Sequence, residues 1–112
     1  MKKVLITQRV DTFEKLNETR ECLDIRIIKF FLTLELIPIP ISSLMITQKN
    51  LLDNYLSNFS IDGIVLSGGN DLGSLKKRDK LEEELLNLSQ KRNIPLFGIC
   101  RGCQMINYFQ NG

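Results

Sequence analysis

Residues 94–102 read Ile94-Pro95-Leu96-Phe97-Gly98-Ile99-Cys100-Arg101-Gly102, an apolar run that ends in a cysteine between two glycines. A proline at the beginning of a strand is tolerated because the N–H group that it lacks is not needed there. Gly98 and Gly102 stand two positions either side of Cys100, and a cramped strand-to-helix turn requires small residues at its flanks. The stretch therefore predicts a buried strand, a sharp turn that lifts the Cys100 thiol above a sheet, and a helix after it.

Cys100 in this position is a candidate nucleophile. A thiol near a helix N-terminus meets the positive end of the helix dipole, which favours the thiolate. The backbone amide of Arg101, the next residue, would point at an oxyanion that develops on a substrate carbonyl. The alternative interpretation is an ordinary buried cysteine at the end of a strand.

Cys103 adds a second alternative, because Cys100-Arg101-Gly102-Cys103 is a C-x-x-C sequence between a strand and a helix, as in thioredoxin-like redox sites. That motif normally follows the first strands of its fold, whereas most of this chain lies upstream, and a redox site gives no reason for Gly98. Two thiols without further ligands do not complete a tetrahedral zinc site, so we expect no metal. We expect Cys103 to be a small apolar packing residue.

Upstream of this stretch, extended and helical patterns alternate. The predicted strands are short apolar runs at residues 4–6, 37–41, 61–66 and 94–99, the second an edge-type segment because of its two prolines. The predicted helices have apolar residues at helical spacing and comprise residues 17–34, 51–59, 79–91 and 104–110, with a loop over 8–15. Strands that alternate with helices indicate a parallel sheet, so the fold class is α/β, in a single domain over residues 1–112.

A glycine-rich stretch, Ser67-Gly68-Gly69-Asn70-Asp71, follows the predicted strand at 61–66. Adjacent glycines allow a main-chain amide to face outward at the carboxyl edge of a parallel sheet, where ligands bind in this architecture. In a hydrolase this amide would be the second oxyanion donor, and without Cys100 a turn without function would be the better interpretation. The stretch lacks the spacing and the lysine of a P-loop, so we expect no nucleotide phosphate there.

Charged residues near the predicted helices have simple structural roles in this interpretation. Arg78-Asp79 with Glu82 is ambiguous in the sequence. The capping-box spacing favours a capping role for Asp79 and Glu82 in the helix at 79–91, and the simplest expectation for Arg78 is a solvated side chain. The charged residues of the first predicted helix are expected to face water, namely Glu18, Arg20, Asp24 and Arg26.

The composition is that of an ordinary soluble domain, with 43% hydrophobic and 25% charged residues. A formal charge of +2 is too weak to indicate nucleic acid or an anionic membrane as a partner. No apolar run approaches the roughly 20 residues of a membrane span, and the N-terminal run is too short for a signal peptide. Three cysteines without an export signal favour the cytoplasm. The chain contains no histidine.

Together these features resemble the class I glutamine amidotransferase superfamily, and within it the γ-glutamyl hydrolase-like branch. The resemblance spans the chain and lies in Ile6-Thr7-Gln8-Arg9 and in residues 62–71, 78–82 and 95–104. It implies a flavodoxin-like parallel sheet with flanking helices, truncated after the nucleophile helix, and neither a metal nor an organic cofactor. Similar proteins from surface-polysaccharide loci, some of which cleave a γ-glutamyl group from a nucleotide-linked phosphoramidate, suggest that substrate class.

The resemblance also implies a Cys-His-Glu triad. A thiolate attacks the γ-carbonyl of a glutamine-like group, a γ-glutamyl thioester forms, and water releases glutamate. Cys100 matches the nucleophile, and the amides of Arg101 and Gly69 match the oxyanion donors. The positions matched to substrate contacts are Gly68, Asn70 and Gln104.

The triad's histidine and acid lie on a later strand and loop in that family, and no residue here can act as the imidazole base. We therefore expect the 112 residues alone to be inactive and to aggregate through an exposed sheet edge. The expected partner is a small γ-glutamyl substrate, with a homo-oligomer or a synthase partner left open. The alternatives are a glutaminase subunit that delivers ammonia, a non-catalytic remnant, and a C-x-x-C redox protein.

Overall fold

Four parallel strands form the centre of the computed structural model, which describes residues 1–58 and 60–110. They are β1 (Lys2–Thr7), β4 (Leu36–Ile41), β5 (Gly63–Leu66) and β6 (Leu96–Gly98). Their order across the sheet is β4-β1-β5-β6, and every neighbouring pair is parallel. The chain winds outward from β1 in both directions, which is the doubly wound, flavodoxin-like arrangement. The four predicted strands and the α/β class are confirmed.

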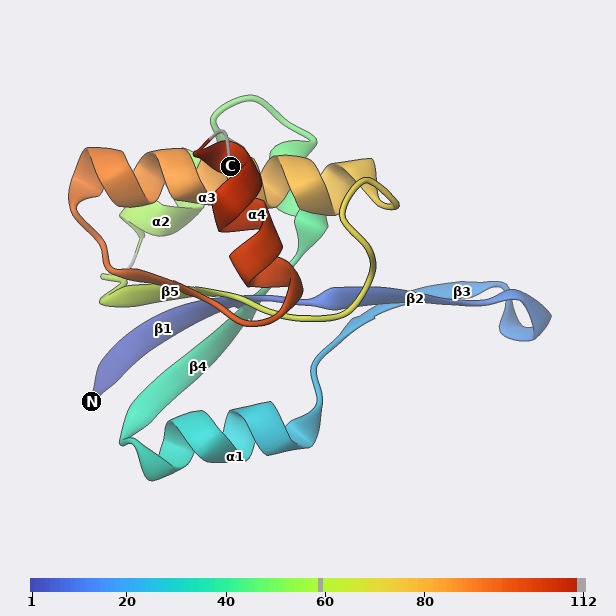
Figure 1. Ribbon diagram of the computed structural model, residues 1–112, viewed down its shortest axis with the longest axis horizontal. Helices are drawn as coiled ribbons and strands as arrows, with labels where there is room; N and C mark the ends of the chain where they lie inside the picture. The colour runs from blue at the N-terminus through green and yellow to red at the C-terminus, as the bar shows by residue number, and fades with distance from the viewer. Residues whose placement is uncertain (59, 111–112) are drawn as a thin grey trace.

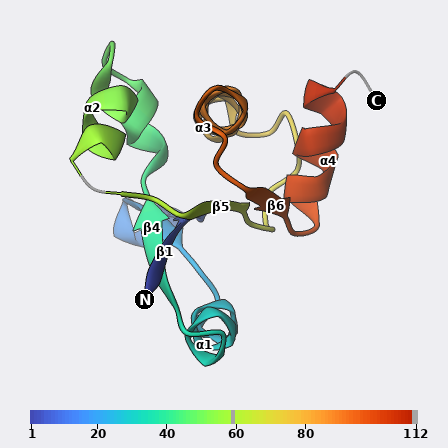
Figure 2. The same cartoon turned by 90° about the vertical axis from the view of Figure 1, so that its left-hand side faces the viewer.

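Helices cover both faces of this sheet, as Figures 1 and 2 show: α1 (Ile25–Thr33) lies on one face, and α2 (Leu51–Ser57), α3 (Lys76–Arg92) and α4 (Arg101–Phe109) lie on the other. Successive strand residues point to opposite faces. Val4, Ile6 and Val65 accordingly pack with Phe31 of α1, whereas Leu5 and its equivalents in β5 join the core under α3. Burial on both faces is the reason why the strands read as continuous apolar runs.

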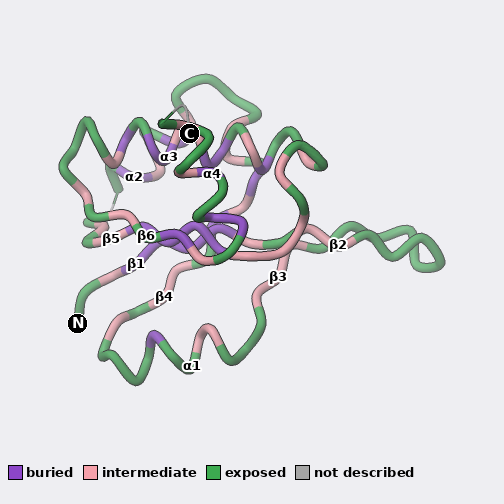
Figure 3. Tube along the Cα trace, in the orientation of Figure 1, coloured by how far each residue is buried: buried purple, intermediate pink, exposed green. Residues whose placement is uncertain are grey.

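A β-hairpin of β2 (Arg9–Phe13) and β3 (Glu18–Cys22) projects from the body of the domain, joined by the short 3-10 helix η1 (Glu14–Leu16) (Figure 1). Most of the hairpin is exposed (Figure 3). The expected loop over 8–15 and the expected helix from Asn17 are therefore wrong. Asn17 instead ends η1 in the left-handed region, with φ 51°.

The first helix begins only at Ile25, and Asp24, predicted to lie within the helix, is its N-cap. Asp24 Oδ1 accepts a hydrogen bond from the Arg26 amide at 2.9 Å, and the Arg26 guanidinium also binds this carboxylate. These bonds lower the pKa of Asp24 to about 2. The charged residues expected to face water do so, but Glu18 and Arg20 lie on β3 and not on a helix.

The remaining helices differ from expectation mainly at their ends. α3 begins at Lys76 and α4 at Arg101, each three residues before the predicted start. The prediction of a helix over 51–59 is confirmed through Ser57, and Phe59 lies outside the described residues, as do residues 111–112. A 3-10 helix, η2 (Ser43–Ile46), follows β4.

The two edges of the sheet differ in how they are protected. Pro38 and Pro40 occupy alternate positions of β4. A proline has no N–H to donate to a neighbouring strand, so Pro38 and Pro40 lie at the positions of β4 that point away from β1. The outer edge of β4 therefore has two fewer N–H groups with which another strand could pair. At the opposite edge, β6 has no proline and its Phe97 side chain is 63% exposed.

Phe97→Lys should reduce self-association of the 112-residue chain, because a charged side chain on an edge strand opposes pairing with another strand. Sedimentation velocity over a range of protein concentrations measures the effect. Leu44→Lys is the matched control, since Leu44 is 54% exposed in η2 and the charge change is the same. Equal effects of the two substitutions would show that net charge, and not the β6 edge, governs association.

Candidate functional site

Cys100 lies in the turn between β6 and α4, with φ 50° and ψ −106°. A non-glycine residue with positive φ is uncommon and strained, and such residues cluster at functional sites. Cys100 is the N-cap of α4, and it is exposed. The strand, sharp turn and helix predicted around Cys100 are therefore present, with the thiol at the positive end of the α4 dipole.

Two close approaches explain the glycines that flank Cys100. A Cβ atom added to Gly98 would lie 2.6 Å from the carbonyl carbon of Gly102, and one added to Gly102 would overlap the carbonyl oxygen of Leu66. The turn thus packs against itself, and the first turn of α4 packs directly on the end of β5. A side chain at either position would force these backbones apart.

The other half of the C-x-x-C sequence does not pack as expected. Cys103 is exposed, and its Sγ donates a hydrogen bond to the carbonyl oxygen of Gly98 at 3.0 Å. The expectation that Cys103 is an apolar packing residue is therefore wrong. Gln104, beside it in α4, is also exposed.

The glycine-rich loop after β5 passes close to Cys100. A Cβ atom on Gly68 would lie 3.6 Å from the Cys100 Cβ, and Gly69 has φ 84°, a conformation that favours glycine. Within the described residues, the amides of Gly68, Gly69 and Asn70 donate to no acceptor, and neither does the amide of Arg101. Both the loop and the helix start that flank Cys100 therefore offer free N–H groups.

The Asn70 side chain attaches the hairpin to this loop. Its Oδ1 accepts from the Val10 amide at 2.8 Å and its Nδ2 donates to the Val10 carbonyl at 3.0 Å. Asn70 itself is in the left-handed region, with φ 61°. Its carboxamide thus pairs with β2 much as a neighbouring strand would.

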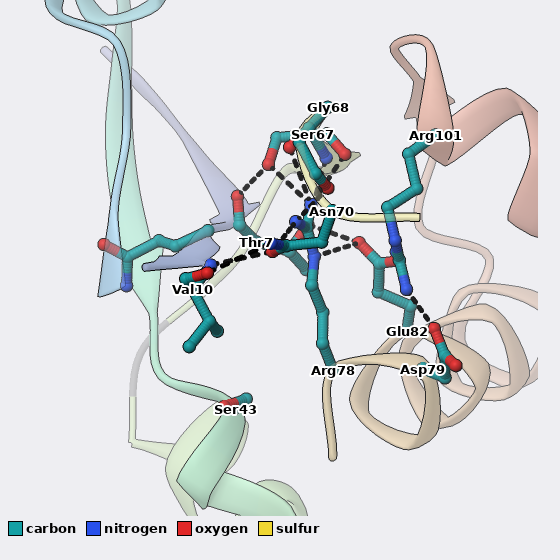
Figure 4. Close-up of polar contacts among 12 residues, drawn as sticks. Thr7, Val10, Ser43, Ser67, Gly68, Asn70, Arg78, Asp79, Glu82 and Arg101 are labelled. Atoms are coloured by element: carbon teal, nitrogen blue, oxygen red, sulfur yellow. Dashed lines mark hydrogen bonds and ion pairs between the residues drawn. The ribbon is translucent and has the colours of Figure 1, made fainter. Parts of the chain in front are cut away.

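Arg78 holds the other side of the loop. Its side chain is fully buried, and its guanidinium donates to the carbonyls of Ser67 at 2.7 Å, Gly68 at 3.0 Å and Gly69 at 2.5 Å (Figure 4). The expectation of a solvated Arg78 is wrong. Burial, followed by the charge of Arg101, lowers the Arg78 pKa to about 10, so this side chain is still a cation at neutral pH.

Two carboxylates balance the buried arginines. Glu82 is fully buried; it accepts from Thr7 Oγ1 at 2.6 Å and from Arg101, and it lies 3.7 Å from Arg78 Nε. Asp79 accepts from Arg101 and from the Gly73 amide, the latter at 2.9 Å. Because α3 begins at Lys76, neither acid forms the expected capping box. We call Arg78, Asp79, Glu82 and Arg101 the buried ion cluster.

The buried ion cluster was not predicted from the sequence, although the sequence contains one signal of it. Arg78 and Glu82 have the i, i+4 spacing of a helical ion pair. Nothing local to Arg101 indicates that its side chain, only 3% exposed, turns inward to α3. The cluster joins the end of β1, the loop after β5, α3 and the first turn of α4.

Cys100 opens into a cavity of about 230 Å³ whose wall comes partly from the hairpin. Arg9 and Cys22 line it together with Ser67, Gly68 and Gly69, and the Arg9 side chain packs directly against Gly69. Arg9 Nε donates to Asp11 at 3.0 Å, and the Cys22 thiol donates to the same carboxylate at 3.2 Å. Burial and the bond to Asp11 raise the pKa of Cys22, which keeps it a thiol.

The described residues offer neither a metal centre nor a membrane helix. No group of three or more His, Cys, Asp or Glu side chains among them is placed to hold a metal ion. No helix among them has the length and apolar character needed to cross a bilayer.

Comparisons with known proteins agree with this geometry. A family model described as Peptidase C26 matches residues 5–112. The chain is 36% identical over 120 aligned positions to the γ-glutamyl-CDP-amidate hydrolase of Campylobacter jejuni, covering 95% of this chain and 54% of that protein. It is 39% identical over 56 positions to a glutamine-hydrolysing GMP synthase of Dictyostelium discoideum, covering 50% of this chain and 8% of the synthase. The chain thus spans about half the length of the first relative and a small part of the second.

Gly102→Ala should destabilise the fold by about 1–3 kcal/mol or more, because its Cβ would overlap the end of β5. Gly63→Ala is the matched control: its Cβ would meet nothing closer than 3.8 Å, so the free energy of unfolding should change by less than about 1 kcal/mol. Urea unfolding followed by circular dichroism measures both. Equal losses in the two variants would contradict the close approach of α4 to β5.

Glu82→Gln should lower the free energy of unfolding by about 3–5 kcal/mol, because it leaves two buried guanidinium groups without their shared carboxylate. Glu83→Gln removes the same charge from the next, only half-buried residue and should change it by about 0.5 kcal/mol or less. Differential scanning calorimetry of the two variants tests this. Melting temperatures that fall together would show that Glu82 has no special role.

Proposed function

The chain belongs to the peptidase C26 family, and from this premise we propose that it carries the nucleophile of a hydrolase that cleaves γ-glutamyl amide bonds. The observation that carries the proposal is the position of Cys100, strained at the start of α4. Backbone amides without an acceptor in the described part of the chain lie on both sides of it. Cys100 is the proposed nucleophile. The amides of Arg101 and Gly69 are the proposed oxyanion donors.

The geometry supports acyl transfer through a thioester. Cys100 attacks the γ-carbonyl carbon as a thiolate, and the oxygen that becomes negative accepts hydrogen bonds from the free amides. Collapse of this intermediate forms a γ-glutamyl thioester and releases the amine, and water then releases glutamate. None of the 112 residues is histidine, so the imidazole that would move protons in these steps is not among them.

The size of the cavity favours a small acyl group. Its volume of about 230 Å³ is below the roughly 300 Å³ at which pockets for larger organic ligands begin. A γ-glutamyl group suits this space, and the leaving group would extend outside it. Gly68, Asn70 and Gln104 stay the proposed substrate contacts, the first two through their backbone amides.

The proposed substrate is a nucleotide-linked γ-glutamyl phosphoramidate. The support is the similarity to the Campylobacter jejuni protein, whose name states that it hydrolyses γ-glutamyl-CDP-amidate. We place this reaction in the cytoplasm and in the synthesis of a surface polysaccharide.

A second candidate is ammonia delivery to a synthase. The similarity to the glutamine-hydrolysing GMP synthase favours it. In that case the partner is a synthase domain or subunit, whereas hydrolysis does not require one; a homo-oligomer is compatible with either candidate. Release of ammonia from glutamine only when a synthase is present would distinguish this candidate.

A glutamine analogue with an electrophilic carbon at the γ position should modify Cys100 of the intact chain. Intact-mass spectrometry should find one adduct, lost in Cys100→Ser and retained in Cys103→Ser, because only Cys100 stands at the helix start beside the free amides.

Two other results would count against the proposal. Equal modification of both cysteines would show that the thiols react without an organised site. Loss of the adduct in Cys103→Ser as well, together with a reversible disulfide in the unmodified chain, would favour the redox alternative.

A further inference from the structure

We propose that Arg78 is a positioning residue for the oxyanion donors: its buried guanidinium fixes the direction of the peptide groups between Ser67 and Asn70. This inference rests on the proposed function, because it concerns the amides that would stabilise the intermediate formed on Cys100. The reaction does not require Arg78 to touch the substrate. Its effect passes through the backbone of the loop.

The geometry of the peptide bond determines in which direction the loop amides point. In a trans peptide the carbonyl of one residue and the N–H of the next point in opposite directions. Arg78 binds the carbonyls of Ser67, Gly68 and Gly69, so the three amides that follow them point away from Arg78 (Figure 4). The cavity that Gly68 and Gly69 share with Cys100 lies beside this loop, and these amides have no acceptor within the described residues.

Only an arginine can make this set of contacts. Nη1 donates to Gly69 O and Asn70 Oδ1, and Nη2 donates to Ser67 O, Ser67 Oγ and Gly68 O. The two terminal nitrogens of a guanidinium carry four N–H groups in a rigid planar fork, so Nη2 shares its two among three acceptors, and Nε has no hydrogen-bond partner within the described residues. An ammonium group is instead a point charge with three rotatable donors. The fork holds three successive carbonyls in one orientation, including those on either side of the left-handed Gly69.

The free-energy cost of this arrangement argues against a role in stability alone. Burying a cation costs several kcal/mol, and well-packed apolar residues of similar volume are often as stable or more stable. Arg78 is held in the core by Glu82, which also binds the Arg101 side chain. The Glu82 carboxylate therefore anchors both proposed sets of oxyanion donors: the loop amides, through Arg78, and the amide of Arg101 at the start of α4.

The test compares two reactions of Cys100 that differ in whether an oxyanion forms. In acylation by a γ-glutamyl nitrophenyl ester, the thiolate forms a C–S bond, the carbonyl oxygen becomes an oxyanion, and the C–O bond then breaks to release nitrophenolate with its electron pair. In alkylation by iodoacetamide, the thiolate displaces iodide from a saturated carbon and no oxyanion forms. Neither leaving group needs a proton, so the chain can be used as it stands.

Arg78→Lys should slow acylation by about 100-fold, the typical cost of a misplaced oxyanion donor, and leave the alkylation rate unchanged. Nitrophenolate absorbance and the mass of the thioester measure the first rate, and adduct mass measures the second. Arg92→Lys is the control on the same helix, since within the described residues Arg92 pairs only with Asp53, in an exposed ion pair of 3.2 Å. It should leave both rates unchanged.

Ser67→Ala is a milder second variant that keeps the guanidinium. It removes a 3.1 Å contact from Arg78 and a hydrogen bond to the Thr7 carbonyl, and it should slow acylation less than Arg78→Lys while sparing alkylation. Equal losses of both rates in both variants would mean a structural role alone and would overturn the inference, as would undiminished acylation in Arg78→Lys. A wild-type chain that is alkylated but never acylated would overturn the proposed function, and this inference with it.

Discussion

The buried ion cluster is the interaction on which the rest of the site depends. Arg78 and Arg101 are almost wholly withdrawn from water, and each would cost several kcal/mol to bury alone. Glu82 lies between them, and Asp79 and the loop carbonyls accept hydrogen bonds from their terminal nitrogens, whereas the Nε atoms of both arginines have no hydrogen-bond partner within the described residues. Because this cluster joins α3 to the loop after β5 and to the start of α4, the two backbone segments beside Cys100 cannot move independently of it.

A steric constraint acts at the same place. The carbonyl oxygen of Leu66 accepts from the Ile99 amide at 2.9 Å and leaves no space for a side chain on Gly102. The chain must therefore turn sharply between these two contacts, and Cys100 is the residue that takes the strained φ and ψ. The buried ion cluster and the close packing of Gly102 on Leu66 together fix the positions of the Cys100 thiol, the start of α4 and the loop amides relative to one another.

The sequence predicts those parts of the structure that depend on neighbours in the chain. The strands, the edge prolines and the turn at Cys100 have local signals, and all are found. The hairpin was missed because Leu16 and Leu23 happen to have helical spacing, whereas the pairing of residues 18–22 with β2 is not visible locally. The roles of Arg78 and Glu82 were missed for a related reason: their partners are a loop and a helix start that only the folded chain brings to them.

The unpredicted hairpin has a functional consequence. Cys100 and its flanking amides come from the ends of β5 and β6. In the proposed reaction they would act alike on any acyl group, so they would select little by themselves. Arg9 and Cys22 come from the hairpin, and Asn70 fastens that hairpin to the loop through both polar atoms of its side chain. The part of the cavity wall that Arg9 and Cys22 form thus lies on a different element from the proposed nucleophile. Changes in the hairpin would alter the shape of the cavity while the strained turn and the buried ion cluster stay as they are. Under the proposed function, selectivity would therefore vary separately from reactivity.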